Sequence, residues 1–261
     1  MVRKMLHVEN LHCGYGRKEI VHGVSFNVEE GEFVCIIGSN GCGKTTLLKN
    51  LLGLTKAFSG EVFMQDKNVQ KLTDLERARL FAYIPQAHTP PFPYSVADVV
   101  LMGRTPYVGR MARVSAEDRR IAWEAMCTLG IEHLAQRTYT KLSGGQQQLI
   151  LIARALTQQP ELIIMDEPTA SLDFGNQQTV LSRMKDLVKT GVSVLMVTHD
   201  PHHAFYCATR VVVMGEGCII AEGSPDDVVT QQCLETIYHT HVEVIEVGME
   251  DGNTRKVCVP L

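Results

Sequence analysis

The chain alternates between short apolar runs and longer segments whose apolar residues recur at helical spacing. The runs at 33–37, 162–165 and 193–197 have the length and composition of strands buried in a parallel sheet. Apolar residues three and four positions apart predict helices within 47–52, 121–129 and 180–188. This alternation of buried strands with helices predicts an α/β fold.

Shorter patterns complete the prediction. Strands are expected at 5–9, 20–28, 61–64 and 81–84, and a hairpin at 211–221. Helices are expected at 73–80 and 147–156, across 95–129 with a break near Pro106, and as a short segment that Pro225 opens. Residues 87–94 carry three prolines and are predicted to be an irregular hinge. The tail from 239 is less regular, with strand-like stretches at 242–247 and 256–259.

The clearest chemical signal is the glycine-rich segment that follows the first buried run. Gly38, Gly43, Lys44 and Thr45 fit the phosphate-loop pattern in the strand–loop–helix context that it needs. Inward-pointing N–H groups and the start of the next helix suit a triphosphate, the Lys44 ammonium reaches its outer phosphates, and the Thr45 hydroxyl suits Mg²⁺. The predicted ATP contacts are Gly38, Ser39, Asn40, Gly41, Cys42, Gly43, Lys44, Thr45 and Thr46.

Cys42 lies inside this loop, two residues before Lys44. We expect that setting to favour the thiolate, so that alkylating reagents attack Cys42 early and bound ATP slows them. The alternative is that Cys42 is simply a small residue that fits the loop.

A second helix start suited to an anion follows at Ser143, Gly144, Gly145 and Gln146. Free N–H groups at a helix start and a serine hydroxyl form the same kind of phosphate site. The alternative is an ordinary well-capped helix. Two such helix starts in one chain favour the functional interpretation.

Polar residues end several predicted strands. Asp166 and Glu167 follow one buried run, where ligands lie in parallel sheets, so Asp166 is expected to hold Mg²⁺ and Glu167 to activate water. His199 ends another and suits a contact to the γ-phosphate or the attacking water. Gln86 could place its carbonyl on Mg²⁺ or water, or be an ordinary strand-end amide. Tyr15, predicted to lie on a turn between two glycines, could stack on adenine or be merely exposed.

Composition limits the alternatives. The chain has 261 residues, 45% of them hydrophobic and 21% charged, which is ordinary for a soluble globular protein of one or two domains. The net charge of −4 gives no reason to expect a nucleic-acid partner. We expect no membrane-spanning helix and no signal peptide. Eight cysteines without a C-x-x-C pair argue against a zinc site and fit a reducing cytosol.

Together, these motifs resemble the ATP-binding subunit of ABC transporters over residues 3–230. Through this resemblance the glycine loop is a Walker A motif, residues 142–146 are the family signature, and 163–167 are Walker B with the catalytic glutamate. The resemblance also gives roles to four further residues: Tyr15 stacks on adenine, Gln86 forms the Q-loop, Asp173 the D-loop and His199 the switch histidine.

The resemblance implies a P-loop NTPase (RecA-like) core with an antiparallel β subdomain and an inserted helical subdomain. The chain would be one ABC ATPase domain over 1–261, with its core at 1–86 and 160–230, the helical subdomain at 87–159 and a short extension at 231–261.

In the family, two subunits face head to tail, so Ser143 would serve the nucleotide of a second copy of this chain, or of a similar chain paired with it. The resemblance also implies integral membrane permease subunits, indirectly an extracytoplasmic solute-binding protein, and a peripheral place on the cytoplasmic face of the membrane.

Residues 93–104 and 171–177 look like those of importers of ferric siderophores, haem, cobalamin and similar metal chelates. Zinc, manganese and molybdate importers share parts of this pattern. A soluble ABC-type ATPase acting on nucleic acid is a further alternative, and an unrelated phosphate-loop kinase or GTPase would leave residues 142–146 without a role. The cargo is not readable from this chain. His202, His203, His239 and His241 show no metal-ligand spacing.

Overall fold

The computed structural model describes residues 4–86, 92–109, 113–248 and 254–261. The chain forms two compact units. Unit 1 comprises Met1–Lys71 and Leu187–Leu261, and unit 2 comprises Leu72–Asp186. Within the described residues, none of the helices has the length and apolar character that crossing a bilayer requires.

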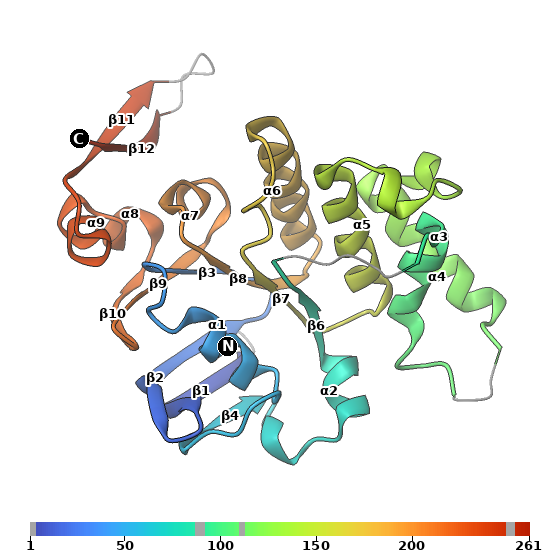
Figure 1. Ribbon diagram of the computed structural model, residues 1–261, viewed down its shortest axis with the longest axis horizontal. Helices are drawn as coiled ribbons and strands as arrows, with labels where there is room; N and C mark the ends of the chain where they lie inside the picture. The colour runs from blue at the N-terminus through green and yellow to red at the C-terminus, as the bar shows by residue number, and fades with distance from the viewer. Residues whose placement is uncertain (1–3, 87–91, 110–112, 249–253) are drawn as a thin grey trace. The chain divides into compact units, whose positions relative to one another are not determined.

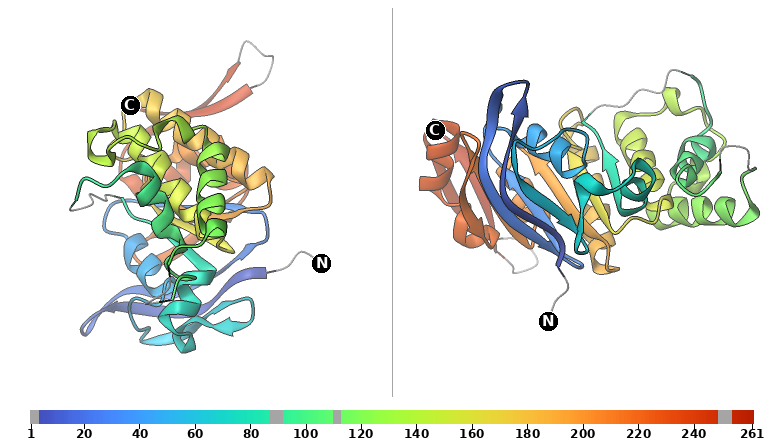
Figure 2. Two further views of the ribbon diagram at one scale, coloured as in Figure 1. Left: turned by 90° about the vertical axis from the view of Figure 1, so that its right-hand side faces the viewer. Right: turned by 90° about the horizontal axis from the view of Figure 1, so that it is seen from below.

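Unit 1 contains an antiparallel sheet in the order β2-β1-β4-β5. These strands are β1 (Lys4–Tyr15), β2 (Lys18–Glu29), β4 (Ser59–Met64) and β5 (Lys67–Asn68). The long β1–β2 ribbon is the dark-blue hairpin in Figure 2. The prediction that Tyr15 lies on the turn is wrong, because the β1–β2 ladder continues until Tyr15 pairs with Lys18. The turn consists of Gly16 and Arg17 alone.

A second group of strands in unit 1 includes the strand that leads into the loop predicted to bind phosphate. β3 (Phe33–Ile37) lies between β8 (Ser193–Thr198) and β9 (Arg210–Gly215), parallel to both, and β10 (Cys218–Gly223) pairs antiparallel with β9. Every residue of β3 and β8 is buried. α1 (Lys44–Leu51) follows β3 and packs against β1 and β2, while α7 (Pro201–Cys207) packs against β3 (Figure 1).

The C-terminal part of unit 1 is more regular than predicted. It contains α8 (Pro225–Val228), α9 (Gln231–Tyr238) and a hairpin of β11 (Val242–Gly248) and β12 (Thr254–Pro260). The helices α7 and α9 have no counterpart in the sequence prediction. Both are short, with seven and eight residues, so each offers only about two turns of pattern along the sequence.

Unit 2 combines a parallel strand pair with helices. β6 (Phe81–Ile84) pairs with β7 (Leu162–Asp166), and α2 (Asp74–Leu80) leads into β6. α3 (Val96–Leu101), α4 (Ala116–Leu129) and α5 (Gly144–Thr157) pack on one another. α6 (Phe174–Lys189) crosses the unit boundary at its last turn. Most of the predicted hinge, residues 87–91, lies outside the described residues.

Candidate nucleotide-binding site

The phosphate loop of unit 1 curls around the Lys44 ammonium. Lys44 is only 5% exposed, and its Nζ donates to the carbonyls of Gly38 at 2.8 Å and Ser39 at 2.9 Å. These acceptors are neutral, so they satisfy N–H donors without cancelling the charge. A buried cation held by neutral groups favours an anion beside it. The loop therefore fits a phosphate group.

Gly43 sets the start of α1. It is the N-cap residue with φ 108°, a backbone conformation that residues with a side chain rarely adopt. No capping hydrogen bond from a side chain closes this helix start, in contrast to most helices of the chain whose caps are described, and the start of a helix suits an anion. Asn40, Gly41 and Thr45 are exposed around this end, while Thr46 is buried.

Tyr15 remains a candidate for adenine stacking even though it belongs to β1. Tyr15 is 46% exposed, and the Lys49 ammonium of α1 lies 5.6 Å from the centroid of its ring. The strand end and the phosphate-loop helix therefore meet at this tyrosine. Stacking on adenine stays a prediction.

The prediction that Cys42 favours the thiolate is wrong. Burial raises the pKa of the Cys42 thiol, and the Lys44 ammonium, 4.0 Å from Sγ, offsets only part of that rise. The alternative of a small residue that fits the loop agrees better with its surroundings. The Cys42 carbonyl accepts from Gly217 N–H in the β9–β10 turn at 3.0 Å, which anchors the loop.

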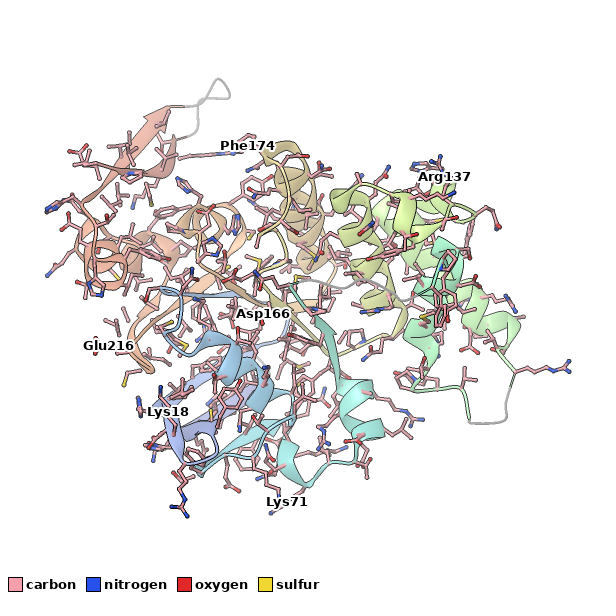
Figure 3. All side chains as sticks on the ribbon, in the orientation of Figure 1. Lys18, Lys71, Arg137, Asp166, Phe174 and Glu216 are labelled. Carbon is pink, nitrogen blue, oxygen red and sulfur yellow. The ribbon has the colours of Figure 1, made fainter. Side chains whose placement is uncertain are left out.

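In unit 2, the acidic pair lies at the carboxyl end of β7, where Figure 3 labels Asp166. Asp166 is buried, and the Tyr83 hydroxyl of β6 lies 3.5 Å from its Oδ2. Burial, and then the Asp166 charge, raise the pKa of Tyr83 to about 12, so the phenol remains a donor. The Gln86 amide nitrogen donates to Glu167 Oε2 at 3.3 Å, which brings these two predicted catalytic residues together.

Glu167 has an unusual backbone. Its φ is 46°, in the left-handed region that side-chain-bearing residues seldom occupy. Such strain persists where the surrounding fold enforces it, and it concentrates at functional sites. The turn directs the chain away from β7, and Ala170 N–H closes it by donating to the Glu167 carbonyl at 3.2 Å.

The predicted signature forms the start of α5. Ser143 is the N-cap: its Oγ accepts from Gln146 N–H at 3.3 Å, and Gln146 Oε1 accepts from Ser143 N–H at 3.2 Å. The capped-helix alternative is thus true of the local structure, and it does not exclude a ligand role. Gly145 has no room for a side chain, because a Cβ there would lie 2.2 Å from Asn176 Oδ1 of α6.

Asp173 has a local role that the sequence prediction did not include. Its carboxylate accepts from Asn176 N–H at 2.9 Å and from the Asn176 amide at 2.7 Å, at the start of α6. These two hydrogen bonds lower the pKa of Asp173. Asp173 and Gly145 therefore both lie against Asn176, so unit 2 brings the D-loop and the signature together.

His199 follows β8 in unit 1 and is exposed. Its carbonyl accepts a hydrogen bond from the Tyr238 hydroxyl of α9 at 2.7 Å. Sequence reasoning missed both tyrosines, Tyr83 and Tyr238. For Tyr83, the signal was its place on the strand predicted just before Gln86; for Tyr238, 39 residues from His199, no local pattern pointed to the contact.

A phosphate loop with a buried lysine in unit 1, and a strand ending in two carboxylates in unit 2, define an ATP-binding protein of the P-loop class. The family described as ABC transporter matches residues 21–170. The chain therefore belongs to the ABC transporter family, as an ATP-binding subunit, and it is a transport ATPase. Its fold is that of the ABC ATPases.

Relatives extend this match over most of the chain. The chain is 35% identical to the molybdate import ATP-binding protein MolC of Haemophilus influenzae, over 91% of this chain and 89% of that protein. It is 34% identical to the iron(3+)-hydroxamate import ATP-binding protein FhuC of Bacillus subtilis, over 97% and 94%. An inward-facing structure of an ABC transporter classed as metal-chelate type matches with a TM-score of 0.88 and 33% identity, over 99% and 98% of the two chains.

Proposed function

We propose that this chain hydrolyses ATP in a head-to-tail pair, in which each nucleotide is held by the phosphate loop of one copy and the signature of the other. The observation that carries the proposal is that one chain has both the buried Lys44 in its loop and the Ser143-capped helix start. The capping box uses Ser143 Oγ only as an acceptor from Gln146 N–H, so the hydroxyl hydrogen can be donated to a ligand.

The residues divide the chemistry between them. Lys44 and the N–H groups from Gly38 to Thr46 bind and orient the phosphates, and Tyr15 stacks on the adenine ring. Ser143, Gly144, Gly145, Gln146 and Asp173 complete the site of the second copy. Glu167 orients and deprotonates the attacking water, and Gln86, which donates to Glu167, fixes the direction of that carboxylate.

Mg²⁺ fits the oxygen donors that this chain offers. A threonine hydroxyl, an aspartate carboxylate and a glutamine carbonyl, from Thr45, Asp166 and Gln86, are ligands that Mg²⁺ accepts together with phosphate oxygens and water. When bound, the ion neutralises charge on the phosphates. Tyr83 keeps the Asp166 carboxylate in place, and His199 contacts the γ-phosphate or the water.

We further propose that the subunit powers the import of a metal-containing small solute. The first candidate is a ferric siderophore, haem or another chelate. The similarity to FhuC and to the metal-chelate type structure supports this cargo. The similarity to MolC, of equal strength, supports molybdate as the second candidate. The chain would act on the cytoplasmic face of the membrane beside integral membrane permease subunits, and an extracytoplasmic solute-binding protein would deliver the solute to those subunits.

The experiment is uptake into proteoliposomes that contain this chain and the multi-span protein encoded beside it, with ATP enclosed. Ferric hydroxamate and molybdate are offered separately with the matching solute-binding protein. We expect ATP-dependent uptake of the iron chelate, and none with Lys44→Met. Uptake of molybdate alone would select the second candidate, and ATP hydrolysis without uptake of either would contradict the import of both.

A further inference from the structure

The C-terminal segment from α9 to β12 is packed onto the part of unit 1 that follows β8. β12 packs against α7, and β11 packs against α9 (Figure 1). α7 begins two residues after His199, with Asp200 as its N-cap. The segment therefore touches the helix that starts at the predicted switch histidine.

The first contact reaches His199 itself. The Tyr238 hydroxyl at the last turn of α9 donates to the His199 carbonyl at 2.7 Å. Burial, followed by the nearby Asp200 charge, raises the pKa of Tyr238, so the phenol stays protonated and keeps donating. The bond holds the main chain of His199. The residue is exposed, and its side chain takes no part in this hydrogen bond.

The second contact passes through His202. Cys258 N–H of β12 donates to His202 Nε2 at 3.1 Å, and a backbone N–H can only donate, so Nε2 is an acceptor. His202 Nδ1 then carries the hydrogen and donates to Asp200 Oδ1 at 2.8 Å. One imidazole thus links the C-terminal hairpin to the residue beside His199.

The segment from Thr198 to His202 has internal hydrogen bonds that connect these two contacts. Asp200 N–H donates to Thr198 Oγ1 at 3.1 Å, and Asp200 Oδ1 also accepts from His202 N–H at 2.9 Å. The residues on both sides of His199 are therefore tied to α7. A small shift of α9 or β12 would move the main chain that aims the histidine ring.

We propose that Tyr238 and His202 are positioning residues, through which the C-terminal segment holds His199 in the orientation that ATP hydrolysis needs. This inference rests on the switch role of His199 in the proposed function. It gives a role to residues 231–261, which lie beyond the match with the ABC transporter family.

The first test is Tyr238→Phe in the full chain, which removes one hydroxyl and keeps the ring. The matched control is Thr236→Val on the same helix, because the Thr236 hydroxyl bonds only within α9, to the Gln232 carbonyl. We expect kcat for ATP hydrolysis to fall about fivefold, the effect of one hydrogen bond, in Tyr238→Phe alone. The Kd for MgATP and the melting temperature should match those of the control. A wild-type kcat would overturn the proposal.

The second test separates positioning from a general loss of stability. His199→Ala and the double variant His199→Ala/Tyr238→Phe are compared with the wild type. If Tyr238 acts through His199, the double variant should be no slower than His199→Ala. A further fivefold loss in the double variant would overturn the proposal. Full activity of His199→Ala would contradict the switch role itself, which is a separate failure of the proposed function.

The third test examines the hairpin link with two substitutions of His202. Gln places its amide oxygen near the position of Nε2 and can accept from Cys258 N–H, whereas Asn reaches only Asp200. Each variant therefore keeps one of the two contacts and breaks the link between β12 and Asp200, so we expect both to lose kcat severalfold. A wild-type kcat in either variant would overturn the role of the hairpin.

Discussion

At the scale of one residue, the buried charge of Lys44 explains why this site favours an anion. Its ammonium is buried against the carbonyls of Gly38 and Ser39, which accept hydrogen bonds but carry no net charge. The fold accommodates this buried charge because the loop curls around the ammonium and surrounds it with carbonyl oxygens. A bound phosphate would supply the missing negative charge.

Glu167 is the residue on which hydrolysis depends. Glu167→Gln keeps the shape of the side chain and removes the base, so we expect steady-state ATP hydrolysis to fall by at least about a hundredfold. The Kd for MgATP should remain at the wild-type value. Glu161→Gln, an exposed acid just before β7, is the matched control and should hydrolyse normally. Unchanged turnover in Glu167→Gln would refute the assignment.

Cys42 should react slowly, in contrast to the expectation from sequence. Because burial raises the pKa of its thiol, little thiolate is present near pH 7, and the alkylation rate should rise as the pH approaches that pKa. The exposed Cys127 is an internal control. Mass spectrometry of each labelled cysteine at several pH values measures both rates. Labelling of Cys42 as fast as Cys127 at pH 7 would contradict the buried environment.

At the scale of elements, a buried ion pair joins α4 to its neighbours in unit 2. Arg104 Nε donates to Asp118 Oδ1 at 2.9 Å, and its Nη1 donates to the Thr157 carbonyl at 3.1 Å. The guanidinium also lies 4.0 Å from the Tyr107 ring centroid. Hydrogen bonds from Ser115, and then from Arg104, lower the pKa of Asp118 to about 2.

Removing Arg104 should destabilise the protein because it leaves a buried carboxylate without its cation. We expect Arg104→Ala to lower the free energy of unfolding by about 3 kcal/mol in urea titrations at pH 7. The exposed Arg119→Ala is the control.

The same ion pair has a pH signature. A pKa that is lower in the folded protein stabilises it above the unfolded value and loses that effect as pH falls towards 2. Asp118→Asn should therefore flatten the loss of stability between about pH 4 and pH 2. An unaltered acid profile in this variant would contradict the assignment to Asp118.

Two serines allow capping to be separated from ligand binding. Ser143 and Ser115 each close a capping box, with Gln146 and Asp118 respectively. Replacing either by Ala should cost about 1 kcal/mol of unfolding free energy, measured by thermal or urea denaturation. Only Ser143→Ala should also slow ATP hydrolysis, by about tenfold. Equal rates of ATP hydrolysis by the two variants would show that Ser143 only caps α5.

Strong local signals were enough for much of the fold. Short buried runs and the phosphate loop predicted β3, β7, β8 and the start of α1, since each is encoded by neighbouring residues. The bond from Gly217 to the Cys42 carbonyl and the bond from Tyr238 to His199 come from residues far along the chain. Tyr15 was misplaced because its two glycines suggested a turn that the β1–β2 ladder overrides.

At the scale of the whole molecule, the chain divides its chemistry between two units. Unit 1 carries the phosphate loop and His199, and unit 2 carries Asp166, Glu167 and the signature. The proposed head-to-tail pair requires the signature of one copy to meet the loop of another. Binding of ATP should then join two copies, and hydrolysis should release them.

The most direct measurement is the mass of Glu167→Gln by sedimentation with and without MgATP. The variant should bind ATP without cleaving it, so its mass should rise from one chain of 29.0 kDa to two. Adding Ser143→Ala should weaken the pair, whereas Ser115→Ala should not. A protein that binds MgATP through Lys44 and still sediments as a single chain at every concentration would contradict the account.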